Sequence, residues 1–133
     1  MKKLFLDTNI VIDLLANREN AAAAYAVFAG VEEGKHRLYL CALSLTNIYY
    51  TTRKYLSHDE RIKVLIKLRE AIDIIPVDAA VLDMALSSGW NDFEDAVQYY
   101  SAKSNPLISG IITRNAKDFK QSELKIMDSS EFL

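Results

Sequence analysis

Cysteine is almost absent from this chain, since Cys41 is the only one among 133 residues. A single thiol excludes an internal disulfide and favours a reducing compartment. Histidine is also scarce, and His36 and His58 do not have the spacing of zinc ligands. The sequence therefore excludes a disulfide-stapled scaffold and gives no support for a zinc site.

Long apolar runs and a large net charge are missing as well. No run approaches the ~20 residues that a membrane span requires, and the apolar stretch before Asp7 is too short for a signal peptide. Because the formal net charge is only -2, any basic surface for nucleic acid has to be local. We therefore expect a cytoplasmic protein that makes no membrane contact.

The composition that remains is that of a folded globular protein. Hydrophobic residues make up 50% of the chain and charged residues 26%, which is a typical balance for a globular domain. A chain of 133 residues is long enough for one substantial core. No repeat, low-complexity stretch or linker divides it, so we expect residues 1–133 to form a single domain.

Short apolar runs with strand character alternate with amphipathic segments along the whole chain. Strands are predicted at residues 2–6, 37–41, 73–77, 107–113 and 124–127. Helices are predicted between them, including residues 21–33, 43–56, 61–72 and 92–104. This alternation predicts an α/β fold, a three-layer α/β/α sandwich with a mainly parallel central sheet.

The first predicted strand ends on three polar residues, Asp7, Thr8 and Asn9. In an open parallel sheet, functional groups gather at the carboxyl ends of the strands. A charged residue at the end of an apolar strand is costly unless it has partners, so we expect other polar groups to meet Asp7 there. Asn9 is predicted to cap the helix that follows.

Two further polar clusters are candidates for those partners. The first opens a predicted helix and contains the acids Asp92, Glu94 and Asp95. Residues 92 and 95 share a helix face, whereas residue 94 is turned aside. The second follows the fourth predicted strand and contains Thr113, Arg114, Asn115 and Asp118.

Acids that converge from separate elements suit a hard divalent cation. Mg²⁺ takes oxygen ligands, keeps several waters and often binds through only one or two carboxylates. Such an ion relieves the repulsion between the acids, lowers the pKa of a bound water and stabilises charge on a phosphate. Cleavage of a phosphodiester bond requires these contributions.

Each of these residues also has a structural interpretation. Asp92 is well placed as a helix N-cap, and Glu94 and Asp95 would interact favourably with the helix dipole. Asp118 can cap a turn, and Arg114 can be an exposed surface arginine instead of a phosphate ligand. None of these signals is specific alone, and it is their order along the chain that favours a functional site.

That order resembles the PIN-domain nucleases, which include the toxin ribonucleases of bacterial toxin–antitoxin pairs. Residues 6–9, Leu-Asp-Thr-Asn, resemble the first motif of the family, and Asp95-Ala96 resembles the third. Residues 113–119 are similar to the late T-R-N-x-x-D-F signature. The likeness runs nearly end to end and implies a parallel sheet flanked by helices, a divalent-metal site and single-stranded RNA as the substrate.

The resemblance also implies roles for individual residues. The catalytic acids would be Asp7, Glu94, Asp95 and Asp118, and the ligands of Mg²⁺ or Mn²⁺ would be Asp7, Asp92 and Asp95. The residues that would shape the site or meet the substrate are Thr8, Asn9, Asn47, Thr113, Arg114 and Asn115.

One position departs from the family pattern. The second motif usually places a glutamate in the helix after the second strand, and Asn47 occupies that position here. Asparagine supplies no charge, so Glu94 or Asp92 would have to compensate. The activity level and the number of metal ions are left open.

We therefore expect a metal-dependent endoribonuclease that cuts single-stranded RNA and acts as the toxin of a toxin–antitoxin pair. The resemblance implies an antitoxin that blocks the crevice, with an arginine presented to the acids, and a homodimer. Two alternatives remain. One is a PIN-like RNA-binding or regulatory module with weak or no catalysis, and the other is a metal-dependent phosphatase or DNA-directed nuclease.

Overall fold

A single parallel sheet of five strands organises the protein in the computed structural model, which describes residues 1–133. The strands are β1 (Lys2–Leu6), β2 (His36–Cys41), β3 (Asp73–Ile75), β4 (Gly110–Thr113) and β5 (Lys125–Asp128). Their order is β3-β2-β1-β4-β5, and every neighbouring pair is parallel. The predicted α/β sandwich is confirmed, and its sheet is parallel throughout.

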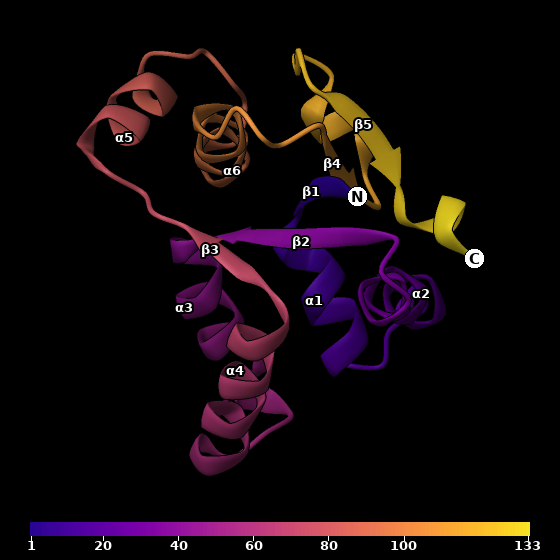
Figure 1. Cartoon of the computed structure of the whole chain (residues 1–133). Helices are drawn as coiled ribbons and strands as arrows, with labels where there is room; N and C mark the ends of the chain where they lie inside the picture. Colours follow the sequence, from indigo (N-terminus) through magenta and orange to yellow (C-terminus); the bar gives the residue numbers. More distant parts are fainter.

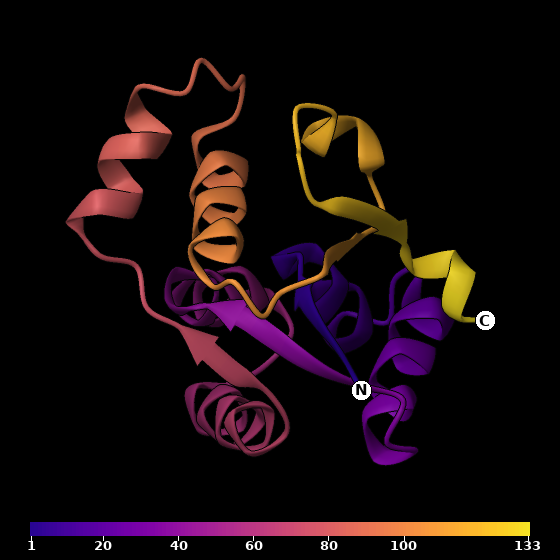
Figure 2. The ribbon, with the colours of Figure 1, turned by 45° about the horizontal axis from the view of Figure 1, so that its top comes forward.

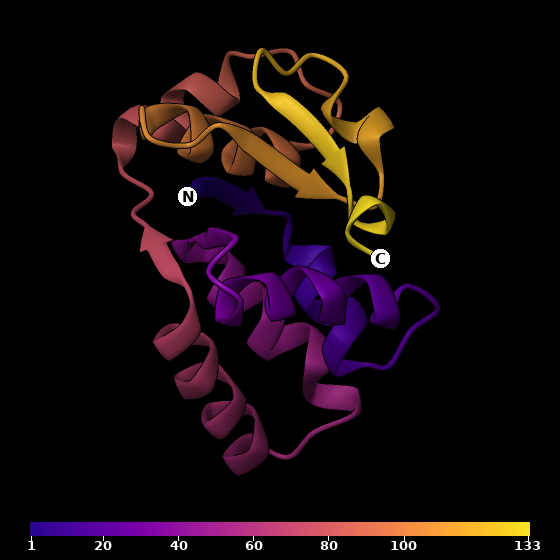
Figure 3. The ribbon, with the colours of Figure 1, turned by 45° about the vertical axis from the view of Figure 1, so that its right-hand side comes forward.

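Six α-helices cover the two faces of this sheet. They are α1 (Thr8–Leu15), α2 (Ala21–Glu32), α3 (Ala42–Thr51), α4 (His58–Ala71), α5 (Ala79–Leu86) and α6 (Phe93–Ser104). Short 3₁₀ turns form η1 (Thr52–Lys54), η2 (Ala116–Phe119) and η3 (Ser129–Phe132). Helices α1 to α4 lie on one face, and α5 and α6 lie on the other (Figures 1 and 3). None of the helices combines the length and the apolar character that crossing a membrane requires.

The strands divide their side chains between two cores. Successive residues of a strand point to opposite faces, so Leu4 and Leu6 enter the core beneath α1, α2 and α4. Phe5 enters the core beneath α5 and α6. Because β1 is apolar toward both faces, it takes the central place in the sheet.

The order of the strands fixes where a site can form. From β1 the chain moves outward to β2 and β3, and then returns through α5 and α6 to β4 on the other side of β1. Figure 2 shows α6 leading into β4. The direction of strand succession therefore reverses between β1 and β4, and ligands of open α/β sheets bind at the carboxyl ends of strands at such a switch point.

Three predicted elements are shorter in the structure. The predicted strand 107–113 begins only at Gly110, because the backbone N–H groups of Leu107 and Ile108 donate to Asn105 instead of to the sheet. The predicted strand 73–77 ends at Ile75. The predicted helix 43–56 ends at Thr51, where the chain passes into η1.

Candidate active site at the carboxyl ends of the central strands

Asp7 follows β1 and is only 2% exposed. Its Oδ2 accepts a hydrogen bond from the Thr113 hydroxyl at 2.7 Å, and its Oδ1 accepts one from Gln98 Nε2 at 3.2 Å. Oδ1 also accepts the backbone N–H of Asn9 at 3.3 Å. Through this contact Asp7 is itself the N-cap of α1, so the predicted cap at Asn9 is wrong. The helix begins at Thr8, one residue before Asn9, so Asn9 lies inside it and cannot cap it.

Gln98, which lies on α6, connects Asp7 to Thr8 of α1, and Thr8 in turn contacts α3. Its Oε1 accepts hydrogen bonds from the backbone N–H and the hydroxyl of Thr8, both at 3.0 Å. The Thr8 hydroxyl also lies 2.6 Å from the Ser44 hydroxyl of α3. Gln98 and Ser44 were not predicted as site residues. A signal for Gln98 did exist, since it lies three residues after Asp95 and so shares its helix face.

Burial and mutual repulsion perturb the acids of this region. Burial raises the pKa of the Asp7 carboxyl, and the hydrogen bonds from Thr113 and Gln98 oppose that shift. The pKa of Asp95 is raised to about 7, first by burial and then by the negative charges of Asp92, Asp7, Asp118 and Glu94. The acids from the end of β1, the start of α6 and η2 therefore lie within electrostatic reach of one another.

An aromatic cluster holds the start of α6 beside η2. Trp90 stacks on Tyr99 with a centroid separation of 4.8 Å and meets Phe119 edge-on at 5.9 Å. Asp92 follows this turn as the N-cap of α6, accepting the backbone N–H of Asp95 at 3.0 Å. The structural interpretation of Asp92 as a cap is thus confirmed.

The acids of the α6 start line two separate cavities. One lies beside η2 and is bordered by Asp92, Asp95, Asp118, Lys117 and Lys120, among others. The other, of about 210 Å³, lies between α3 and α6 and includes Glu94.

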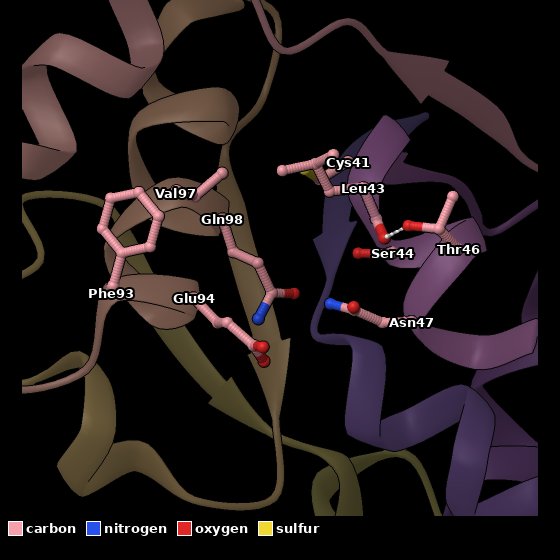
Figure 4. A pocket seen from close by; sticks show the side chains of 9 residues that line it. All are labelled: Cys41, Leu43, Ser44, Thr46, Asn47, Phe93, Glu94, Val97 and Gln98. Carbon is pink, nitrogen blue, oxygen red and sulfur yellow. Dashed lines mark hydrogen bonds between the residues drawn. The ribbon is translucent and has the colours of Figure 1, made fainter. Parts of the chain in front are cut away.

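Figure 4 shows the second cavity, which we call the α3–α6 pocket and define by Cys41, Leu43, Ser44, Thr46, Asn47, Phe93, Glu94, Val97 and Gln98. The side chains of Glu94 and Asn47 reach into it from opposite walls. Glu94 therefore shares a cavity with Asn47, whereas Asp92 does not.

The remaining predicted residues have distinct surroundings. Thr8 is buried within the Gln98 network, whereas the Asn9 side chain is exposed. The backbone N–H of Asn115 donates to the Thr113 hydroxyl at 3.1 Å. Arg114 points to another acid, since its Nε lies 2.9 Å from Oδ2 of Asp13.

The acids near the switch point fit a hard divalent cation in kind, because carboxylate oxygens are among the ligands that it prefers. The carboxyls of Asp7 and Asp95 both have raised pKa values. Nevertheless, no three His, Cys, Asp or Glu side chains are grouped as a complete metal site. The ligand set Asp7, Asp92 and Asp95 remains a prediction, and a site here would need waters to complete the coordination.

Solved structures of toxin–antitoxin proteins share this fold. VapBC-1 of nontypeable Haemophilus influenzae aligns with a TM-score of 0.69 at 18% identity, covering 96% of this chain and 98% of that one. A toxin–antitoxin complex of Klebsiella pneumoniae aligns with a TM-score of 0.67 at 21% identity, covering 95% and 97%. VapC20 of Mycobacterium tuberculosis, a sarcin–ricin loop cleaving toxin, aligns with a TM-score of 0.64 at 15% identity, covering 81% and 86%.

Comparison of sequences gives the family directly. No curated protein matches the chain in sequence. The sequence model of the PIN domain, however, matches residues 3–117. This match spans most of the chain and includes Asp7, Asp95 and Thr113. The chain therefore belongs to the PIN domain family.

Proposed function

We propose that the protein is a divalent-metal-dependent endoribonuclease that cuts single-stranded RNA. The observation that supports this proposal is that Asp95 lies within electrostatic reach of Asp7, which follows the central strand, and that burial and neighbouring charges raise the pKa of Asp95 to about 7. The nearby groups bonded to Asp7 are neutral, so they leave its negative charge uncompensated. Uncompensated carboxylates at the mouth of a site are suited to a cation.

One structural neighbour favours RNA as the substrate. VapC20 cleaves the sarcin–ricin loop, and this chain shares its fold. The α3–α6 pocket offers an apolar wall with the half-exposed ring of Phe93 and a polar wall with Glu94 and Asn47. Bases of single-stranded nucleic acid stack on aromatic rings and expose hydrogen-bonding edges, so an unpaired nucleotide suits this pocket.

The acids would bind the metal ion, and their neighbours would orient them. Asp7 and Asp95 would hold Mg²⁺ or Mn²⁺, and Asp118 would contribute through a water. When bound, the ion would lower the pKa of a water and stabilise negative charge on the phosphate. Thr113 and Gln98 each bind one oxygen of Asp7, and so fix the direction in which its remaining lone pairs point.

Glu94 would supply the carboxylate that the family usually has at the position of Asn47. It reaches into the same pocket as Asn47, and its carboxylate adds to the charge that Asp95 experiences. Asp92 is the weaker candidate for this role, because its carboxylate caps α6 and lines the other cavity.

An antitoxin is the partner that the relatives favour, since the Klebsiella structure is a toxin–antitoxin complex. An antitoxin segment that presents an arginine to Asp7 and Asp95 would form charge-assisted hydrogen bonds there and exclude a metal ion. Co-expression with the product of a neighbouring small reading frame tests this, because a genuine antitoxin should co-purify and suppress cleavage. A homodimer is proposed on the family resemblance and is tested by light scattering.

Cleavage of single-stranded RNA by the purified protein tests the proposed activity. We expect cutting with Mg²⁺ or Mn²⁺, none with EDTA, and a loss of at least about a hundredfold in Asp7→Asn, since even residues that only support a metal ligand contribute 10–100-fold. Asp83→Asn, an exposed acid on α5, is the matched control and should cut normally. Cleavage that survives Asp7→Asn would mean a contaminant or another site. DNA and small phosphoesters in the same assay separate a DNA nuclease or a phosphatase.

A second function, an RNA-binding module without turnover, is favoured by one observation. Asn47 stands where an acid is usual, and no three acids are grouped for a metal. RNA binding by the intact protein, with no cleavage across a series of divalent metals, would support this function over the first.

A further inference from the structure

A second buried carboxylate lies on α1, outside the acids considered so far. The Asp13 side chain is 1% exposed, and two arginines approach it. Arg114 Nε lies 2.9 Å from Oδ2, and Arg18 Nη1 lies 3.8 Å from Oδ1. Neither carboxylate oxygen has a well-aligned hydrogen bond, so the attraction is mainly that of charge.

Two separate parts of the chain bring the arginines to this carboxylate. After α1 the chain turns at Asn17, whose φ of 49° is left-handed, and the backbone N–H of Arg18 donates to the Asp13 carbonyl at 3.0 Å. Arg114 comes from the other end of the chain. It directly follows Thr113, whose hydroxyl binds Asp7.

The contact with Asp13 leaves part of each arginine side chain free to bind another group. Each side chain remains 35% exposed, and neither guanidinium has another ion-pair or hydrogen-bond partner in the protein. A guanidinium has five N–H donors in a planar fork, so most donors of both groups are free. With two positive charges and one negative charge, the group carries a surplus positive charge beside the acids of the switch point.

The burial of Asp13 requires a reason beyond stability. A buried ion pair is often no more stabilising than apolar residues of the same volume, because desolvating the charges offsets their attraction. What Asp13 does provide is a fixed anchor. Without it, no other side chain of the protein would hold the Arg114 guanidinium in place, since Asp13 is its only partner.

We propose that Asp13 is a positioning residue that holds Arg114 and Arg18 as a clamp for a backbone phosphate of the bound RNA. This inference rests on the proposed function and deepens it. Arginine is suited to the role because its fork matches the oxygens of a phosphate. Since Arg114 directly follows Thr113, whose hydroxyl binds Asp7, we expect the clamped phosphate to neighbour the phosphate that is cut.

The salt dependence of RNA binding tests the clamp. Neutralising one phosphate of a single strand contributes about -0.7 to the slope of log K against log salt. The probe is a fluorescein-labelled single-stranded RNA about a dozen nucleotides long, and the protein carries Asp7→Asn to prevent cleavage. Between about 50 and about 200 mM salt, adding Arg114→Gln should make the slope shallower by about 0.7 and weaken binding severalfold.

Three variants separate the clamp from a merely structural role. Arg114→Lys keeps a charge and should keep the slope while losing affinity. Asp13→Asn should weaken binding and raise KM more than it lowers kcat in the otherwise native enzyme. Arg37→Gln is the matched control, because Arg37 pairs with Asp73 near the amino ends of β2 and β3, whereas Asp7 lies at the carboxyl end of β1. It should leave the slope unchanged.

The outcomes separate this inference from the proposed function. If the native enzyme cuts RNA but the slope of log K against log salt is unaltered in Arg114→Gln and Arg18→Gln, the clamp alone is overturned. The two arginines would then have a structural role or would bind an acidic partner segment. If Arg114→Gln fails to fold, Arg114→Lys and Asp13→Asn decide the question by slope and by KM. Absence of any RNA binding or cleavage overturns both proposals.

Discussion

Two buried aspartates, less than two helical turns apart, have opposite surroundings. Asp7 is held by a hydroxyl, a side-chain amide and a backbone N–H, all of them neutral. Asp13 is held by the two guanidinium groups of Arg114 and Arg18. Burial raises the pKa of both carboxyls, but the two arginines oppose the shift at Asp13. At Asp7, the charge of Asp118 raises the pKa further.

This difference shows how one fold can use the same residue type in two ways. At Asp13 the protein itself supplies the compensating charge. At Asp7 it supplies only orientation and leaves the charge to be compensated from outside. If that contrast is correct, then removing charge partners should destabilise the Asp13 region, whereas the Asp7 region should respond mainly to added cations.

The largest effect on stability is expected when the Asp13 region loses its main cation. Arg114→Met leaves a buried carboxylate with only the more distant Arg18, and we expect a loss of about 3 kcal/mol in the free energy of unfolding at neutral pH. Adding Asp13→Asn should recover much of this loss, because the unpaired charge disappears. Urea denaturation of the single and double variants measures both values.

The stability loss caused by removing Arg114 should depend on pH. The folded-state pKa of Asp13 already lies above its ordinary value, and removing an arginine raises it further. The group therefore favours the folded state most at low pH, and this contribution is lost as the pH rises through the folded pKa. The free energy of unfolding of Arg114→Met should be closer to that of the native protein near pH 4 than near pH 7.

Arg37→Met is the control for this comparison. It breaks an exposed pair and should lower the free energy of unfolding by less than about 1 kcal/mol. Equal losses in the two variants would refute the contrast.

A smaller effect is expected when charge is removed from the α3–α6 pocket. Glu94→Gln should lower Mn²⁺ affinity about tenfold, and Asn47→Glu in the same protein should restore it, because both side chains reach into one cavity. Titration followed by electron paramagnetic resonance measures the affinity directly. Asp92→Asn is the control. Because asparagine also caps a helix, any change in Mn²⁺ affinity in this variant reports only the loss of the Asp92 charge. Undiminished affinity and cleavage in Glu94→Gln would end the idea that Glu94 compensates for Asn47.

The sequence best predicted the features that depend on residues close together in the chain. The placement of Asp7 at a strand end, the acids at the start of α6 and the alternation of strands with helices all follow from patterns within a few residues. The Asn9 cap failed because the helix already begins at Thr8, so Asn9 lies inside it and donates its own N–H to Asp7. The strand predicted from residue 107 was too long because apolar character continues where pairing does not, and Leu107 is exposed.

The contacts that organise the site are not local. Gln98 meets Asp7 across 91 positions, and Thr113 meets it across 106. Arg114 meets Asp13 only because β4 pairs with β1. Such contacts depend on the strand order, and periodicity does not specify that order. The sequence could therefore suggest which acids matter, but not that Asp13 would gather two arginines.

The smallest effect concerns Asp95, which belongs with the uncompensated region. Its pKa is raised from 3.8 to about 7 in the folded protein, so this group favours folding below pH 4 and that contribution is lost as the pH rises toward 7. In EDTA, the Tm of the native protein should therefore fall relative to that of Asp95→Asn across this range. The difference should be a few degrees, because Asp95 retains contact with water.

Divalent metal should remove that difference at neutral pH, because a ligand that binds only the folded state raises its stability. Excess Mn²⁺ should raise the Tm of the native protein at pH 7 but not that of Asp95→Asn or Asp7→Asn. Asp13→Asn should respond to Mn²⁺ as the native protein does, since its charge is compensated from within. A Tm that responds equally to Mn²⁺ in all four proteins would mean that the ion binds elsewhere, and that the uncompensated charge at Asp7 and Asp95 does not serve a cation.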